Sequence, residues 1–221
     1  LADELGVDAA KVTIIANAVD LPAPALDRAR WRERLRVTAA TPLVCMVANL
    51  HRYKDHATLV AAWRRVVDGG AGPSPVLLLA GRRGDTAGKV ESLVARLALG
   101  ESVQLLGEVD DVAGLLAAVD LFAFSSRHEG CPNAVLEAMA AGLPVVATDD
   151  PGNREALGPE GYFVASGDSA ALADAIVRLL ADPERRRAEG TRNRQRIATA
   201  FPPQRSWELH AELISGLLAT S

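Results

Sequence analysis

Short apolar runs alternate with amphipathic stretches from residue 43 to residue 181 of the chain. The runs show little polar alternation, which is the pattern of strands that are buried on both faces. They are LVCMVA (43–48), VLLLA (76–80), VQLL (103–106), LFAF (121–124), PVVAT (144–148) and YFV (162–164). We therefore expect a core of buried strands in this part of the chain.

The stretches between the runs have the periodicity of helices. Helices are expected at 56–67, where Leu59, Val60, Trp63 and Val67 share one face, at 87–98, and in shorter form at 110–119 and 134–141. Strict alternation of strand and helix indicates βαβ units, because parallel neighbours need a crossover connection. The pattern predicts an α/β fold with a doubly wound parallel sheet.

The two ends of the chain differ from this central pattern. Residues 11–21 indicate a short β run, and a proline-rich connector then becomes a helix up to residue 35. After residue 163 helices dominate. The first has Asp168 or Ser169 as N-cap, and Asp182-Pro183 opens an arginine-rich helix whose basic side chains we expect to face solvent. A final helix has an apolar side to bury, formed by Trp207, Leu209, Leu213, Ile214 and Leu217.

Composition narrows the class of protein. The 221 residues are 49% apolar and 24% charged, which suits a large core under an ordinary soluble surface. A net charge of −4 and an aromatic content of 4% argue against a nucleic-acid partner. The two cysteines, Cys45 and Cys131, form no CxxC motif, so we expect no disulfide framework or zinc site and a reducing, cytoplasmic location.

No targeting or membrane segment is expected. No apolar stretch reaches the roughly 18–20 residues that span a bilayer, and the opening LADELGVD lacks a basic n-region. The first residue is Leu1 rather than Met, so we expect the chain to be a fragment.

Candidate chemistry concentrates in the segment SSRHEGCPNAVLEAMAAGLPVVAT (125–148). In doubly wound sheets, ligands bind beyond the carboxyl ends of the strands. Here a strand ends at residue 124, a loop follows, and a helix is expected to begin near Asn133. The first turn of a helix offers unpaired N–H groups and a positive dipole end, which suit an anion such as phosphate.

The loop residues fit this interpretation. Gly130 lets the backbone approach a ligand closely, and Pro132 has no N–H, so the donors must come from Cys131, Asn133 and Ala134. The alternative is an ordinary helix start that is capped by a serine or asparagine side chain.

Two glutamates, Glu129 and Glu137, lie eight positions apart. Glycosidase pairs need carboxyl groups roughly 5–5.5 Å or 6.5–9.5 Å apart, whereas eight helical residues span roughly 12 Å. The spacing better fits two carboxylates that hold the two ends of one extended ligand. A carboxylate at Glu137 can accept two hydroxyls, as acidic residues do from ribose; the alternative is a glutamate on the helix surface.

The stretch EGCPNAVLEAMAAGLPVVAT, with seven residues between its two glutamates, resembles the signature of retaining family-4 glycosyltransferases of GT-B fold. The resemblance covers essentially the whole chain. IIANAVDL resembles the "IPNGVD" segment that leads into the family's second domain, and VANLHRYKDHATLVAAW resembles its donor-binding strand and helix. LLGEVDDVAGLLAAVDLF and SGDSAALADAIVRLLADPERR also fit.

The resemblance implies two Rossmann-like domains that face a cleft, with the nucleotide-sugar donor mostly on the second and the acceptor on the first. This chain resembles the second domain only. Residues 1–24 would be the tail of a missing N-terminal domain and the linker, 25–202 the nucleotide-sugar-binding domain, and 203–221 a helix that crosses back. No metal or other cofactor is implied, and any peripheral contact with a membrane would involve the missing domain.

The resemblance also implies a role for each matching residue. Glu137 would bind the ribose, Glu129 the donor-sugar hydroxyls, and the backbone of Gly130, Cys131, Asn133 and Ala134 the diphosphate or sugar. Lys54 would neutralise the departing diphosphate. Its place just past a strand end makes sense, since a point charge there reaches phosphate.

The chain departs from the family pattern at one position. An arginine often lies five residues before the lysine, where this chain has Asn49, and Arg52 is the candidate to replace it. Gly81, in the turn GRRGD, is expected to line the site through its backbone. Val109, in LGEVDD, is expected to contact the base.

The implied reaction moves a sugar from a nucleoside diphosphate to an acceptor hydroxyl with retention, and the isolated domain would bind donor without being a complete catalyst. Two alternatives remain: an epimerase or phosphorylase-like enzyme on the same fold, and a non-catalytic nucleotide-sugar-binding module. A dinucleotide-dependent oxidoreductase lacks support, because ANLHRYK stands where G-x-G-x-x-G would follow the first strand. Base, sugar and acceptor cannot be predicted.

Overall fold

The computed structural model describes residues 6–8, 11–69 and 73–219. Its described part contains a six-stranded, entirely parallel sheet in the order β3-β2-β1-β4-β5-β6. The strands are β1 (Leu43–Val47), β2 (Val76–Ala80), β3 (Val103–Gly107), β4 (Leu121–Phe124), β5 (Val145–Thr148) and β6 (Tyr162–Val164). The doubly wound α/β prediction is confirmed, and each expected strand forms within a residue or two of the apolar run that predicted it.

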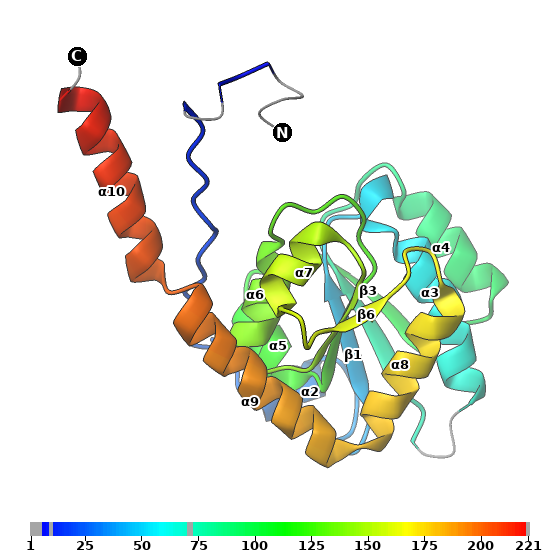
Figure 1. The fold of residues 1–221 in the computed structure, drawn as a ribbon. Helices are drawn as coiled ribbons and strands as arrows, with labels where there is room; N and C mark the ends of the chain where they lie inside the picture. Colours follow the sequence, from blue (N-terminus) through cyan, green and yellow to red (C-terminus); the bar gives the residue numbers. More distant parts are fainter. Residues whose placement is uncertain (1–5, 9–10, 70–72, 220–221) are drawn as a thin grey trace.

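Helices cover both faces of this sheet (Figure 1). One face carries α2 (Arg28–Arg34), α5 (Val112–Ala118), α6 (Asn133–Ala140) and α9 (Pro183–Ala200). The other carries α3 (His56–Asp68), α4 (Ala87–Arg96) and α8 (Ser169–Ala181). The chain also forms α7 (Pro151–Leu157), α10 (Pro203–Ala219) and the 3₁₀ turn η2 (Arg52–Lys54).

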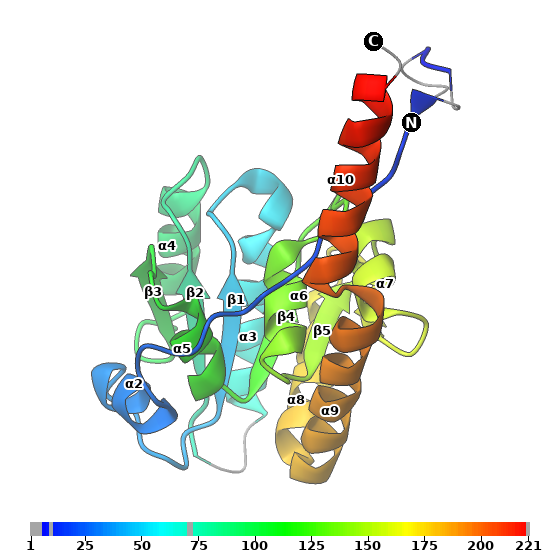
Figure 2. The ribbon, with the colours of Figure 1, turned by 90° about the vertical axis from the view of Figure 1, so that its left-hand side faces the viewer.

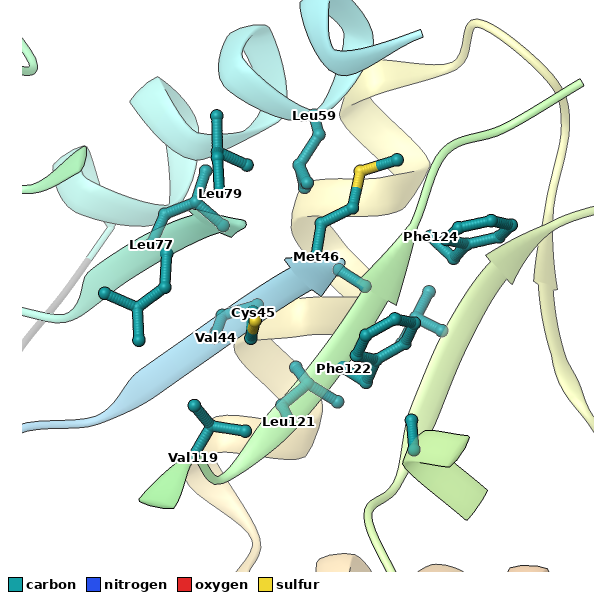
Figure 3. Close-up of a cluster of buried hydrophobic side chains, with 14 of the residues drawn as sticks. Val44, Cys45, Met46, Leu59, Leu77, Leu79, Val119, Leu121, Phe122 and Phe124 are labelled. Atoms are coloured by element: carbon teal, nitrogen blue, oxygen red, sulfur yellow. The ribbon is translucent and has the colours of Figure 1, made fainter. Parts of the chain in front are cut away.

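The double cover explains the apolar runs. All four residues of β4 and all five of β2 are buried, so neither face of these strands needs polar side chains. Figure 3 shows Met46 of β1 and Phe124 of β4 among the apolar side chains of this core. Both side chains are fully buried. The core thereby holds the strand ends that carry the candidate site.

The strand order places a crevice at a definite point. β1 pairs with β2 on one side and with β4 on the other, both in parallel. Strands β1 to β3 extend the sheet in one direction and β4 to β6 extend it in the other, so the order of strand addition reverses between β1 and β4. The loops that leave these two strands diverge to opposite faces, and ligands of doubly wound sheets bind at this switch point. The loops after β1 and β4 are therefore the place to look for chemistry.

The expected β run at 11–21 is wrong, because these residues form no strand. Sequence pattern indicates β propensity, but a strand also needs a partner, and the segment runs away from the sheet beside α10 (Figures 1 and 2). The Ser206 hydroxyl donates to the Ala16 carbonyl at 3.4 Å. Residues 1–5 lie outside the described residues.

Helix α10 leaves most of its apolar side exposed, so the described residues do not cover the apolar side that the sequence predicts. Trp207 is 63% exposed and Ile214 56%, and the helix projects beyond the sheet (Figure 2).

Helix α7 has no counterpart among the predicted elements, although Asp150 caps it and Pro151 opens it. No helix in the described ranges combines the length and apolarity needed to cross a bilayer.

Candidate functional site

The Lys54 ammonium and the Glu129 carboxylate meet at the switch point. Lys54 ends η2 after β1, and Glu129 lies in the loop after β4, 75 positions later. Nζ donates to Oε1 at 2.5 Å, and the two side chains are only 16% and 11% exposed. The ammonium also lies 5.3 Å from the centre of the Phe124 ring. Water and salt screen a sheltered charge pair less than an exposed pair. The sheltered pair therefore attracts charged or hydroxyl-rich ligands more strongly.

Two buried serines join the loops that carry this pair. The Ser125 hydroxyl donates to the carbonyls of Lys54 and Asp55 at 3.1 and 3.0 Å. The single hydroxyl proton of Ser126 is shared between two acceptors, the Tyr53 carbonyl at 3.2 Å and the Glu129 carboxylate. Sequence analysis missed both residues, although two serines directly after a buried strand were a visible signal.

Asp150 supports the Glu129 loop from the end of β5. Its carboxylate accepts hydrogen bonds from the backbone N–H groups of His128 at 2.7 Å, of Glu129 at 3.1 Å and of Gly152 at 3.1 Å. His128 has φ of 60°, in the left-handed region that non-glycine residues seldom adopt, so these bonds hold a bend that the chain would otherwise avoid. Sequence analysis missed Asp150, whose signal was an acid before the Pro-Gly start of α7.

The N-terminus of α6 is uncapped. Its N-cap residue is Pro132, which makes no side-chain hydrogen bond to the helix, so the alternative of a serine or asparagine cap does not apply. The N–H groups of Val135 and Leu136 donate to the Pro132 carbonyl, whereas those of Asn133 and Ala134 have no partner among the described residues. These two donors remain free for a ligand.

The loop before α6 is open on one side and pinned on the other. Nothing lies within 4 Å of where a Cβ of Gly130 would be. The Asn17 amide donates to the Cys131 carbonyl at 2.8 Å and to the Asn133 side-chain oxygen at 2.9 Å. Burial raises the pKa of the Cys131 thiol, which keeps the thiol neutral. Asn17 was missed because residues 11–21 were interpreted as a short β run that leads into the domain, with no contact to the loop before α6.

Glu137 lies one turn into α6, half-buried among apolar neighbours. Within the described part of the chain its carboxylate has no hydrogen bond or ion pair, and burial raises the pKa of this carboxyl group. A half-buried carboxylate without a partner is unfavourable unless a ligand supplies donors. Glu137 is therefore poised to bind hydroxyl groups.

The remaining predicted residues lie around this centre without joining it. Arg52 is exposed and lines a hollow of about 570 Å³ with Tyr53, Asp55, Arg127 and His128, which does not include Glu129 or Glu137. The Asn49 side chain accepts from the Arg82 N–H at 2.9 Å. Gly81 is required sterically, since a Cβ there would lie 2.1 Å from the Ala48 carbonyl oxygen. Val109 is half-buried against the core.

The described residues contain no group of three or more His, Cys, Asp or Glu side chains that could hold a metal ion. The described site thus consists of one cation, two carboxylates and free backbone donors. That set suits an anion attached to hydroxyl-bearing groups.

Comparison with known proteins agrees with this geometry. A family model described as glycosyl transferases group 1 matches residues 41–182, which include Lys54, Glu129 and Glu137. The chain belongs to this family. Its parallel sheet and flanking helices have the arrangement of the Rossmann-like domain of GT-B glycosyltransferases, as the sequence resemblance implied.

Relatives of this glycosyltransferase chain are longer than it is. It is 32% identical over 209 residues to the GDP-mannose-dependent monoacylated alpha-(1-6)-phosphatidylinositol monomannoside mannosyltransferase of Corynebacterium glutamicum, covering 89% of this chain and 52% of that protein. HepE of Anabaena, in complex with UDP and glucose, superposes with a TM-score of 0.87 at 25% identity, over 97% of this chain and 59% of HepE.

A second solved structure extends the comparison. Sucrose-phosphate synthase of Thermosynechococcus elongatus matches with a TM-score of 0.87 at 30% identity, over 100% of this chain and 56% of the synthase. The chain thus spans about half the length of the curated relatives it matches.

Proposed function

We propose that this chain is the donor-binding half of a retaining glycosyltransferase, and that it holds a nucleoside-diphosphate sugar at the switch point between β1 and β4. The single observation that carries the proposal is the conjunction at one site of the sheltered Lys54–Glu129 pair, the uncapped N-terminus of α6 and the unpartnered carboxylate of Glu137. Each of the three features suits a different part of one such ligand.

The diphosphate would lie against the free N–H groups of Asn133 and Ala134. Two backbone donors and the positive end of the helix dipole favour an anion there, and the open space over Gly130 leaves room for it. Lys54 adds a full positive charge from the neighbouring loop. These groups would stabilise the negative charge that develops on the diphosphate as the sugar leaves.

The two glutamates would hold the parts on either side of the diphosphate. Glu137, one turn along α6, would accept hydroxyls of the ribose. Glu129 would accept hydroxyls of the donor sugar, and its bond to Lys54 would then be shared with the ligand. Neither carboxylate is needed as a general base in this scheme, because the protein works by positioning and electrostatic stabilisation.

The donor class has support from relatives rather than from this chain alone. One relative is named as GDP-mannose-dependent, another as using UDP-Gal, and HepE was solved with UDP-glucose. All three compounds are nucleoside-diphosphate hexoses; two share uridine as the nucleoside, and all three sugars differ. The proposal therefore names the class of donor and leaves base, sugar and acceptor open.

The acceptor would lie on a further domain. The exposed apolar side of α10 needs a cover that the described residues do not supply, and the relatives are about twice as long as this chain. We expect residues 1–24 and 203–221 to join that domain. The chain by itself would bind donor and transfer little sugar.

The test is calorimetry of the chain with UDP, GDP and ADP and with their hexose conjugates. At least one nucleotide should bind, and Lys54→Ala and Glu137→Gln should each lower its affinity about 10- to 100-fold, as loss of a charged hydrogen bond of about 1.5–3 kcal/mol implies. Arg65→Ala, in the last turn of α3, and Glu184→Ala, in the first turn of α9, are exposed positions away from the site and serve as controls. Unchanged affinity in both site variants would overturn the assignment.

Glu129→Gln separates the sugar subsite from the nucleotide subsite. It should weaken binding of the nucleotide sugar while leaving the plain nucleoside diphosphate almost unaffected. Incubation with nucleotide sugar and no acceptor adds a check on the reaction class, since an epimerase would convert the sugar and a transferase would not.

A further inference from the structure

Helix α9 is rich in arginine, yet three of its arginines do not simply face solvent. They donate to carbonyls at the C-terminal ends of other helices: Arg186 to Leu179 and Leu180 of α8, Arg196 to Glu155 and Ala156 of α7, and Arg194 to Ala141 at the end of α6. The last carbonyls of a helix lack internal partners and form its negative dipole end. Expecting a solvated face was therefore wrong for Arg186 and Arg196, which are partly buried, whereas Arg194 makes its bond from an exposed position.

Contact with the end of α6 involves three residues on one face of α9. Gly190, Asn193 and Arg194 lie at i, i+3 and i+4, positions that share a helix face. A Cβ on Gly190 would lie 2.0 Å from the Gly142 carbonyl oxygen. The Asn193 amide, 1% exposed, donates to the Leu143 carbonyl at 2.7 Å, and Arg194 donates to Ala141 at 2.7 Å.

Helix α6 is the element that carries the candidate donor site. It has eight residues, so its two ends are only roughly 12 Å apart. A helix this short moves as a rod, and a shift at its C-terminal turn carries its N–H donors and Glu137 with it. Figure 2 shows α9 lying along α6.

We propose that the Gly190–Asn193–Arg194 face of α9 is a positioning element for the donor site. It holds the turn after α6, and through α6 it sets where the N–H groups of Asn133 and Ala134 and the Glu137 carboxylate meet the ligand. This inference rests on the proposed function. None of the three α9 residues touches the ligand, and they act only through the placement of α6.

The test uses variants of α9 in the whole chain. Gly190→Ala must displace the Gly142 turn by at least roughly 1 Å, because carbon–oxygen contacts in proteins close to about 3.3 Å. Arg194→Ala removes one bond to α6. Arg186→Ala is the control, since it removes two bonds of the same kind from the same helix, but to α8.

Two readouts are measured: the affinity for UDP and GDP by calorimetry, and the backbone amide NMR shifts of Asn133 and Ala134 without ligand. We expect Gly190→Ala to lower the affinity about tenfold and Arg194→Ala to lower it about threefold. In both variants the amide signals of Asn133 and Ala134 should shift. Arg194→Lys should restore the affinity. Arg186→Ala should stay within about twofold of the wild type, with both amides unmoved.

The outcomes separate this inference from the proposed function. If the wild-type chain binds no nucleotide, the proposed function fails, and the ligand-free amide shifts still decide whether α9 sets the position of α6. If the wild type binds and both α9 variants bind equally well with unmoved amides, the inference is overturned. An equal effect of Arg186→Ala would overturn it as well, because the effect would then be general loss of stability. Should Gly190→Ala fail to fold, the Arg194→Ala and Arg194→Lys pair decides.

Discussion

His56 should make this protein lose stability in mild acid. It is the first residue of α3, two positions after Lys54, and its side chain is 2% exposed. Burial lowers the pKa of His56 to about 4, from an ordinary value of 6.5. The imidazole is therefore neutral in the folded chain at any pH above that value.

The sign of the effect follows from which state takes up the proton first. As pH falls below 6.5 the unfolded chain protonates His56 while the folded chain does not, so the free energy of unfolding falls with pH. At 1.36 kcal/mol per pKa unit, the loss from His56 is about 2 kcal/mol by pH 5 and levels off at about 3 kcal/mol below pH 4.

Urea unfolding of the wild type and of His56→Leu at pH 7.5 and pH 5.0 measures this, with the buried Trp31 and Trp63 as fluorescence probes. Other titrating groups are common to both proteins and cancel in the difference. The wild type should lose about 2 kcal/mol more than the variant over this interval. His210→Ala, on the exposed surface of α10, should lose as much as the wild type. If His56→Leu shows the same loss as the wild type, the buried imidazole is not the cause.

Two further predictions concern carboxylates of the site. Glu137→Gln should raise the free energy of unfolding at pH 7 while weakening nucleotide binding, because the raised pKa of the half-buried carboxyl means that its ionisation opposes folding. The stability gain should shrink as pH falls through the raised pKa toward the ordinary value of 4.5 and be absent below 4.5, which unfolding curves at pH 7 and pH 4 would show. Asp150→Ala should cost about 1–3 kcal/mol, since three N–H groups lose their acceptor. Its neighbour Asp149, in an exposed pair with Arg154, should change stability by no more than about 1 kcal/mol when replaced by Ala. Equal unfolding midpoints for the two Asp variants would refute this account of the Glu129 loop.

The amino-acid sequence by itself determined most of the helices and strands. Strand β1 lies within the run LVCMVA, α6 begins at Asn133, and Asp168 and Asp182 cap α8 and α9 as predicted. These features depend on neighbours within a turn or on burial of both faces of a strand, and both are written in local periodicity. The segment with Glu129 and Glu137 was recognisable for the same reason, since its parts are contiguous in the chain.

Only the tertiary structure decided which distant groups meet. Nothing local to Lys54 indicates that its ammonium lies 2.5 Å from a carboxylate 75 positions away, or that Asn17 and Asp150 hold the loop between them. The arginines of α9 appear in the sequence as a basic stretch, and residues 11–21 as a strand. Whether a guanidinium finds a helix end, or an extended segment finds a sheet edge, depends on the packing of elements far apart in the chain. Local periodicity carries no information about that packing.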